Sequence, residues 1–273
     1  MAISHRELFA WALPRLGLEP RSFERLGKQV RKRIGRRVSE LGLGDLSAYR
    51  GYLETHPEEW QELDARCYVT ISRFFRDRAV FELLERVALP GLAAQAEADG
   101  RHELSVWSAG AAGGEEAYSL ALLWRFRLAP SYPGLELRVL GTEIDPVSLS
   151  RAARRRYPPG CLREVPADIR EAAFVRVGAE LELRAELANG VRFEHEDLRQ
   201  VIAAGPFDMI CCRNLAFTYF DSATRPAVLA ALLTRLRGGG YLLIGRRESL
   251  PLALPALHEA SPDSRLYRLA DRP

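Results

Sequence analysis

The stretch LSVWSAGAAGGEEAYS, residues 104–119, decides the fold and carries the strongest functional signal of the chain. Strand-forming residues lead into the small residues of 109–114, and Glu115 and Glu116 then open a helical pattern. In an α/β sheet, ligands bind in the crevice beyond the carboxyl ends of the strands. Small residues let a ligand approach the backbone closely. The stretch therefore predicts a ligand pocket at the end of a strand.

The two acids argue against a phosphate pocket of the P-loop type. A P-loop carries Lys and then Ser or Thr after its last glycine, whereas carboxylates at these positions would repel a pyrophosphate. An acidic turn suits a cationic ligand, so we expect one here.

The remainder of the chain predicts two domains and one insertion. Residues 1–87 show helical periodicity without a strand signal, and we assign them to an N-terminal helical domain. Residues 88–273 alternate strands with helices, which predicts a doubly wound, mostly parallel sheet. Residues 157–190 interrupt this alternation and predict a small inserted β-subdomain with a hairpin. The predicted strands are 104–109, 136–142, 191–196, 207–212, 240–245 and 265–269, and the predicted helices between them are 115–127, 147–155 and 222–236.

Composition narrows the class of protein. The chain has 273 residues, of which 47% are hydrophobic and 27% charged, as is ordinary for a soluble globular protein. No stretch approaches the ~20 apolar residues that span a bilayer, and the N-terminus lacks a secretory pattern. We therefore expect a cytoplasmic protein. The four cysteines match neither a zinc site nor a disulfide framework, so no metal is expected.

Positive charge is concentrated in residues 21–37. Apolar residues recur there every three or four positions, which predicts an amphipathic helix with one basic face. That face is either simply solvated or a docking surface for an acidic partner. Sparse aromatic residues argue against binding of single-stranded nucleic acid. The eight bases are Arg21, Arg25, Lys28, Arg31, Lys32, Arg33, Arg36 and Arg37, against the single acid Glu24.

Two further strand ends carry polar side chains. Glu143 ends the strand after the small-residue turn, where an acid commonly holds the hydroxyls of a ribose. Arg213 and Asn214 end a nonpolar strand and would face the same crevice.

At this point the residues resemble those of a known family. The segments SRFFRD (72–77), WSAG (107–110), GEEAYS (114–119), CRN (212–214) and GYL (240–242) are similar to motifs of the CheR family. Its members are S-adenosylmethionine-dependent methyltransferases that esterify glutamates on bacterial chemoreceptors. The resemblance implies a class I methyltransferase fold with a seven-stranded sheet, a small N-terminal all-helical domain and an inserted β-subdomain.

The resemblance also implies site residues. Arg76, Arg213 and Tyr219 are expected at the methyl-transfer site, and S-adenosylmethionine is the expected cofactor, with S-adenosylhomocysteine as product. Glu116 is expected to contact the cofactor, Glu143 its ribose, and Asp197 with Leu198 its adenine. The full set of expected cofactor-binding residues is Thr70, Ser72, Arg76, Ala109, Gly110, Glu116, Glu143, Asp197, Leu198, Asn214 and Leu215.

Departures from the family pattern concern the methyl acceptor. Four residues, in place of the family's three, separate Asn214 from the pair Tyr219 and Phe220, and Arg246 and Arg247 add positive charge. The predicted hairpin is short, so we expect no tethering of a receptor's tail peptide. Three functions stay open. They are methylation of glutamates on a chemoreceptor helix docked on the basic helix, methylation of a carboxylated or amino small molecule or peptide, and cofactor binding without catalysis.

Overall fold

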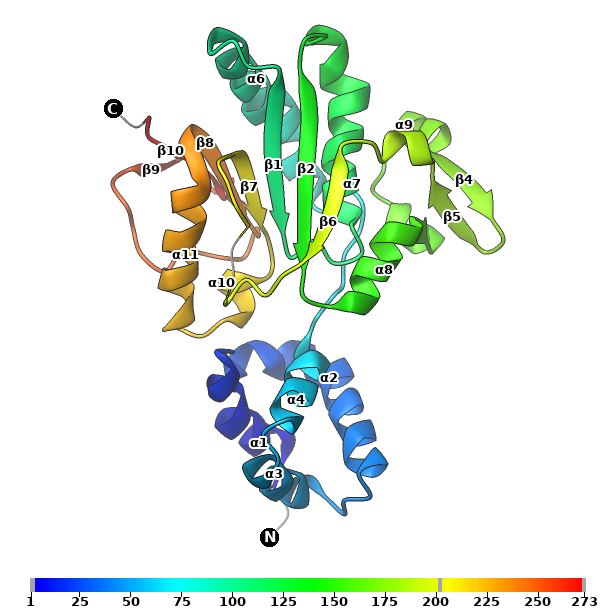
Figure 1. Cartoon of the computed structure of the whole chain (residues 1–273), viewed down its shortest axis with the longest axis vertical. Coiled ribbons are helices and arrows are strands. Elements are labelled where there is room, and N and C mark those ends of the chain that lie inside the picture. The colour runs from blue at the N-terminus through cyan, green and yellow to red at the C-terminus, as the bar shows by residue number, and fades with distance from the viewer. Residues whose placement is uncertain (1–2, 201–202, 272–273) are drawn as a thin grey trace. The chain divides into compact units, whose positions relative to one another are not determined.

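The computed structural model describes residues 3–200 and 203–271, without the side chains of 25–27, and the chain forms two compact units (Figure 1). One unit comprises Met1–Val69 with Thr218–Pro226, and the other comprises Thr70–Phe217 with Ala227–Pro273. The boundary at Val69 precedes the predicted boundary at residue 87. Helices α5 (Arg78–Leu83) and α6 (Leu89–Ala98), joined by the π-helical Leu84–Ala88, bury side chains in the core of the larger unit.

The smaller unit is built from helices. Helices α1 (His5–Ala12) and α2 (Pro20–Glu40) are followed by α3 (Leu46–Thr55) and α4 (Glu59–Cys67), and Leu13–Leu16 forms a 3-10 turn. Phe23, Val30 and Ile34 on one face of α2 are buried, which is the amphipathic pattern that the sequence predicts.

The larger unit contains a seven-stranded sheet in the order β6-β2-β1-β7-β8-β10-β9. Strands β1, β2, β6, β7 and β8 pair in parallel, and β10 and β9 complete the sheet in antiparallel. The predicted fold class is therefore confirmed, although β9 was not predicted. The bounds are β1 Glu103–Ala109, β2 Glu136–Glu143, β6 Val191–His195, β7 Phe207–Cys212, β8 Leu236–Ile244, β9 Leu257–Glu259 and β10 Leu266–Leu269.

The strand order creates a crevice at a defined place. The chain runs outward from β1 to β2 and β6, and then returns to β7 on the other side of β1. Connections therefore diverge at β1 and β7, and ligands bind at such a switch point, beyond the carboxyl ends of the strands.

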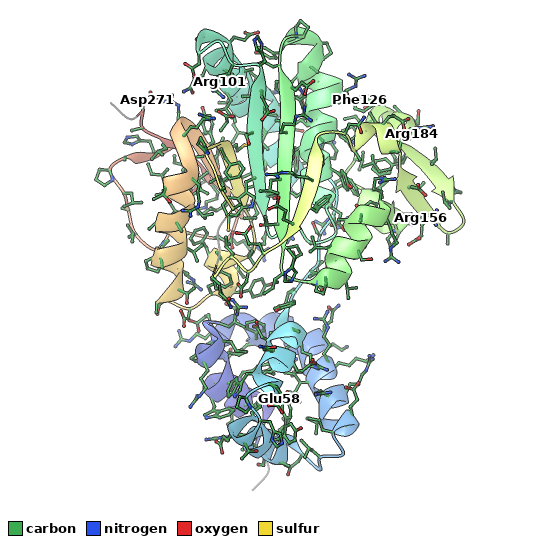
Figure 2. All side chains as sticks on the ribbon, in the orientation of Figure 1. Glu58, Arg101, Phe126, Arg156, Arg184 and Asp271 are labelled. Atoms are coloured by element: carbon green, nitrogen blue, oxygen red, sulfur yellow. The ribbon has the colours of Figure 1, made fainter. Side chains whose placement is uncertain are left out.

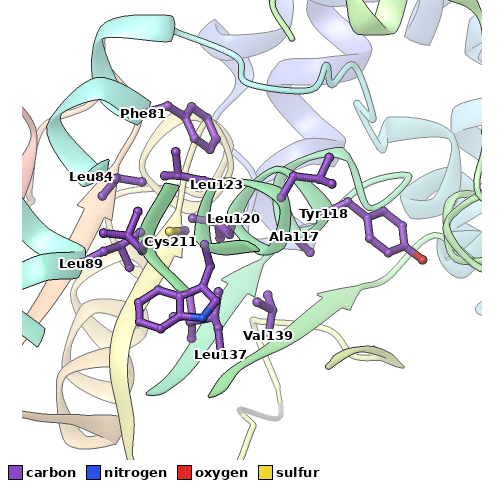
Figure 3. Close-up of a cluster of buried hydrophobic side chains, with 14 of the residues drawn as sticks. Phe81, Leu84, Leu89, Ala117, Tyr118, Leu120, Leu123, Leu137, Val139 and Cys211 are labelled. Carbon is purple, nitrogen blue, oxygen red and sulfur yellow. The ribbon is translucent and has the colours of Figure 1, made fainter. Parts of the chain in front are cut away.

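Helices cover the sheet (Figure 1). They are α7 (Glu115–Leu123), which continues as the π-helical Trp124–Leu128, α8 (Pro146–Arg154) and α11 (Thr224–Arg235). A 3-10 turn, Ala129–Ser131, follows the π-helical segment. Figure 3 shows part of the apolar core, to which Phe81, Leu89 and Leu123 from the helices and Val139 and Cys211 from the strands belong. Full burial of each large apolar side chain contributes about 1.5–3 kcal/mol to stability, so this cluster holds the helices against the sheet.

The insertion after α8 forms its own small sheet. Strands β3 (Arg156–Tyr157), β5 (Glu180–Leu183) and β4 (Phe174–Val177) pair in antiparallel in that order, next to α9 (Ala167–Ala173). The 3-10 turns Pro159–Leu162 and Ala185–Leu187 flank these elements. Figure 2 labels Arg156 and Arg184 on this insert. A β-subdomain with a hairpin is thus present where it was expected.

No helix among the described residues is both long enough and apolar enough to cross a bilayer.

Candidate functional site

The turn between β1 and α7 is fixed by its own backbone. The N–H groups of Gly110 and Ala111 donate to the carbonyl of Thr142 at 2.8 and 2.9 Å, which ties the turn to the end of β2. Gly110 has a φ of +79°, and a Cβ there would clash with the side chain of Leu215. The expected cofactor residues Gly110 and Leu215 therefore meet at the switch point, where the close approach requires glycine.

Glu143 at the end of β2 is a buried acceptor. Its Oε2 accepts the N–H of Ala112 at 2.8 Å, and its Oε1 accepts the N–H groups of Ile144 and Asp145, each at 3.0 Å. Burial raises the pKa of this carboxyl, although the three amides favour the charged form. A carboxylate oxygen has two lone pairs, so Oε2 retains capacity for a further donor such as a hydroxyl.

Arg213 links three segments of the site. Its Nη1 donates to Glu116 Oε2 at 3.0 Å, and its Nη2 donates to Asp77 Oδ2 at 2.7 Å and to the carbonyl of Arg76 at 3.0 Å. Ser108 Oγ donates to the other oxygen of Glu116 at 2.8 Å. Burial alone would lower the pKa of Arg213, but the carboxylates of Glu116 and Asp77 outweigh it and the pKa is raised.

Arg213 is buried and bound to other groups of the protein. Its side chain is only 3% exposed, and both of its terminal nitrogens are committed to protein acceptors. Arg213 therefore connects the end of β7 to the first turn of α7 and to residues 76–77.

The two acids of the turn differ from one another. Glu115 is fully buried, and its Oε1 lies 3.1 Å from Arg151 Nη2. Burial raises the pKa of Glu115, against the opposing effect of Arg151. The Glu116 side chain keeps 14% exposure. Each acid already faces an arginine, so the turn is less negative than its sequence indicates, and Glu116 is the acid that retains access.

The SRFFRD segment forms a bent turn. Phe75 and Asp77 have φ values of +51° and +65°, and the N–H of Phe75 donates to Ser119 Oγ at 2.9 Å. Arg76 is half-buried, and its Nη1 donates to the carbonyl of Ile71 at 3.0 Å. The expected residues Thr70 and Ser72 are half-buried in the same segment.

Sequence reasoning did not identify Glu248, which holds the ends of β7 and β8 together. Its Oε2 accepts the N–H of Asn214 at 2.8 Å and the N–H of Gly245 at 2.6 Å. Asn214 has a φ of +56°, a conformation that these contacts fix. An acid three residues after a strand-ending glycine was the available signal.

Asp197 and Leu198 follow β6, at the same sheet edge as Glu143. The N–H of Glu196 donates to the carbonyl of Glu143 at 3.1 Å, which holds this segment beside the end of β2. The carboxylate of Asp197 accepts two bonds from the Arg199 side chain at 2.9 Å, and Leu198 is buried. Their contact with adenine stays a prediction.

Tyr219 belongs to the smaller unit. Its ring centroid lies 5.6 Å from that of Phe23, and its carbonyl accepts the N–H of Glu19 at 2.8 Å. Its expected role at the methyl acceptor stays a prediction.

The basic residues of α2 fall into two groups. Arg33 Nη1 donates to the carbonyl of Tyr68 at 2.6 Å, and Arg37 forms two hydrogen bonds with the buried Glu59, at 3.0 and 2.6 Å. These two bases stabilise the unit internally. Arg25 lies outside the described side chains and Arg31 is half-buried, whereas Arg21, Lys28, Lys32 and Arg36 are exposed.

Two family models match the chain. The model described as CheR methyltransferase, SAM binding domain, matches residues 70–264, and the model described as CheR methyltransferase, all-alpha domain, matches residues 27–63. These matches confirm the predicted resemblance, the class of enzyme at the level of the family, and S-adenosylmethionine as the cofactor.

Individual relatives agree with the models. A chemotaxis protein methyltransferase of Escherichia coli (strain K12) is 32% identical over 228 residues, covering 81% of this chain and 76% of that protein. One of Listeria innocua is 31% identical over 182 residues, covering 67% of this chain and 66% of that protein. An uncharacterized 104.1 kDa protein of Rhodobacter capsulatus is 31% identical over 224 residues, but the matched region spans only 23% of its length.

Among solved structures, the N-methyltransferase NodS of Bradyrhizobium japonicum in complex with S-adenosylhomocysteine is 15% identical, with a TM-score of 0.37. The match covers 63% of this chain and 62% of that one.

Proposed function

This chain belongs to the CheR methyltransferase family, and we propose that it methylates the carboxylates of glutamate side chains on a chemoreceptor-like protein. The observation that carries the proposal is that both family domains match, the all-alpha domain at 27–63 and the SAM binding domain at 70–264. Relatives named chemotaxis protein methyltransferase match over 81% of this chain. The acceptor glutamates would lie on the cytoplasmic domain of such a receptor, so the proposal also places the chain in the cytoplasm.

The hydrogen-bond acceptors of the crevice fit S-adenosylmethionine. The cofactor is rich in hydrogen-bond donors, with an ammonium group and two ribose hydroxyls. Glu143 retains acceptor capacity for a hydroxyl, and Glu116 keeps 14% exposure, so that its carboxylate could accept from the ammonium. Gly110 and Leu215 pack closely against each other at the same edge of the sheet.

The chain's residues then have orientation as their main task. When bound, the cofactor supplies an electrophilic methyl group on a sulfonium sulfur. A glutamate side chain has a pKa near ~4.3 and is ionised at neutral pH, so no residue of the chain has to remove its proton. Arg213 and Glu116 hold the turn that binds the cofactor, and Arg76 is proposed to lie beside the methyl group. Alignment of reacting groups of this kind supplies much of the rate in transfer reactions.

The exposed bases of α2 support a protein acceptor. Arg21, Lys28, Lys32 and Arg36 are exposed on the smaller unit, where an acidic receptor helix would find complementary charge. Arg33 and Arg37 are excluded from this role because their side chains bind Tyr68 and Glu59.

The proposal is tested by incubating the purified chain with radiolabelled S-adenosylmethionine and a cytoplasmic chemoreceptor fragment. We expect label on the fragment that base releases as methanol, because carboxyl methyl esters are base-labile. Label in small molecules alone would favour the small-acceptor alternative. Binding of S-adenosylhomocysteine without any transfer would favour a catalytically inactive module.

A further inference from the structure

We propose that the inserted subdomain positions both loops of the cofactor crevice, through Tyr157 and Glu164. One loop is the turn between β1 and α7, and the other is the SRFFRD turn at residues 72–77. The inference rests on the proposed function only for its catalytic readout. It gives the short insert a role inside the enzyme.

Tyr157 holds the first loop. Its side chain is fully buried, and its OH donates to the carbonyl of Gly113 at 2.7 Å. The guanidinium of Arg151 in α8 also lies against Gly113, so closely that a Cβ there would clash with it. Gly113 directly precedes Gly114, the N-cap residue of α7. Both the insert and α8 therefore contact this loop at Gly113.

Glu164 holds the second loop. Its Oε2 accepts the N–H of Asp77 at 3.0 Å, and its Oε1 lies 2.9 Å from Arg73 Nε in an ion pair. The carbonyl of Cys161, also in the insert, accepts the N–H of Phe74 at 3.0 Å. Two backbone N–H groups of the SRFFRD turn thus depend on the insert.

Packing joins the two attachments. The ring of Phe74 meets the rings of Tyr157 and Phe174 edge-to-face, with centroids 4.8 and 5.1 Å apart. All three rings are buried. A displacement of the insert would therefore move both loops together.

The backbone of the second loop explains why such support is needed. Phe75 and Asp77 both have positive φ values, a conformation that costs non-glycine residues about 1–3 kcal/mol each and persists only when the surroundings enforce it. The N–H of Asp77 is bound by Glu164, and its carboxylate is bound by Arg213. Glu164 and Tyr157 are positioning residues in this account, because each acts through a loop.

The test compares Tyr157→Phe and Glu164→Ala with two matched controls. Tyr118→Phe removes a buried OH that donates to the carbonyl of Ala152 in α8 at 3.0 Å, and not to a backbone group of either loop. Glu182→Ala removes an insert carboxylate that pairs with Arg156 at 2.7 Å. The readouts are calorimetric affinity for S-adenosylhomocysteine, and hydrogen exchange of peptides covering 70–78 and 109–118.

We expect Tyr157→Phe to weaken S-adenosylhomocysteine about fivefold, the scale of one lost hydrogen bond, and to speed exchange in 109–118. Glu164→Ala should speed exchange in 70–78 and lower kcat for receptor methylation about tenfold, with a smaller change in KM for the cofactor. Glu164→Gln retains an acceptor for the Asp77 N–H and should recover part of the loss. Tyr118→Phe should have the same melting temperature as Tyr157→Phe, and Glu182→Ala the same as Glu164→Ala. Neither control should change the affinity for S-adenosylhomocysteine or the hydrogen exchange of the two loops.

The inference is overturned if Tyr157→Phe and Glu164→Ala alter melting temperature only, as the controls do. A wild-type chain that binds S-adenosylhomocysteine but methylates no receptor would contradict the proposed function instead. In that case affinity and hydrogen exchange still decide the role of the insert.

Discussion

The carboxyl edge of the sheet and helix α2 are both rich in charge, yet they use it differently. At the sheet edge the guanidinium of Arg213 is almost fully buried and bound to two carboxylates. On α2, bases such as Lys28 and Lys32 are exposed. Buried charges fix the geometry of a site, and removal of one partner leaves the other uncompensated. Exposed charges act over distance and are screened by salt. Mutations at the sheet edge should therefore change the free energy of unfolding. Mutations on the exposed face of α2 should change the rate at which the chain encounters its acceptor.

The largest effect is expected for Arg213→Gln. The substitution leaves the carboxylates of Glu116 and Asp77 without their cation, and should lower the free energy of unfolding by about 3–5 kcal/mol. Urea denaturation measures this change. Arg268→Gln, which breaks an exposed pair with Asp271, is the control and should cost no more than about 0.5 kcal/mol. Equal effects in the two variants would remove the distinction between buried and exposed charge.

A smaller loss is expected for Glu248→Ala. The buried carboxylate accepts two backbone N–H groups, and its removal should cost about 2–4 kcal/mol of unfolding free energy. Affinity for S-adenosylhomocysteine should fall as well, because Asn214 loses its support. Glu248→Gln keeps one acceptor oxygen and should recover part of both losses. A Glu248→Ala chain with unchanged affinity would show that the end of β7 does not contribute to the cofactor site.

The pH dependence of stability tests the buried carboxyl of Glu115. Burial raises its pKa in the folded chain above the unfolded value of 4.5. The corresponding stability is fully present below that unfolded value and is lost as the pH rises through the raised folded pKa. Glu115→Gln cannot ionise, so its unfolding free energy should decline less between pH 4 and pH 8, by about 1.4 kcal/mol for each unit of pKa shift. Parallel pH profiles for the two proteins would contradict the assignment.

The smallest effect on stability is expected on α2. The double reversal Lys28→Glu and Lys32→Glu should change unfolding free energy by no more than about 0.5 kcal/mol. Receptor methylation should nevertheless slow several-fold at low salt, and the difference should shrink as salt is added. Arg192→Glu, a charge reversal at an exposed position on β6, is the control. If the methylation rate of the double variant does not depend on salt, the exposed face of α2 is only solvated and does not dock the receptor.

Arg37→Ala should behave oppositely and lower the free energy of unfolding, because it leaves the buried carboxylate of Glu59 without its arginine partner.

Local patterns in the sequence were sufficient to predict most strands of the large sheet, and to predict which strand ends carry the polar residues of the site. The periodicity of residues 104–109 and 207–212 indicated β1 and β7, and the parallel order placed Gly110 and Asn214 at one edge. The short β9 has too few residues for a pattern to be visible. The domain boundary was expected too late in the chain, because helical periodicity at 78–87 does not say which core a helix joins.

The partners of buried side chains could not be predicted in this way. Arg213 was expected at the methyl group, but its acceptors come from positions 97 and 136 residues away in the sequence. Tyr157 and Glu164 likewise act on segments far along the chain. A single sequence records residue types, whereas these pairings depend on how the sheet and the insert bring separate loops together.

The most direct test of the account is the chemical identity of the methylated group. A chemoreceptor fragment is incubated with the chain and S-adenosylmethionine, digested, and sequenced by mass spectrometry. We expect methyl esters on glutamate side chains of the fragment after incubation with the wild-type chain, and none after incubation with the Arg213→Gln variant. Methyl groups on nitrogen atoms, or an unmodified fragment beside a chain that binds S-adenosylhomocysteine, would contradict it.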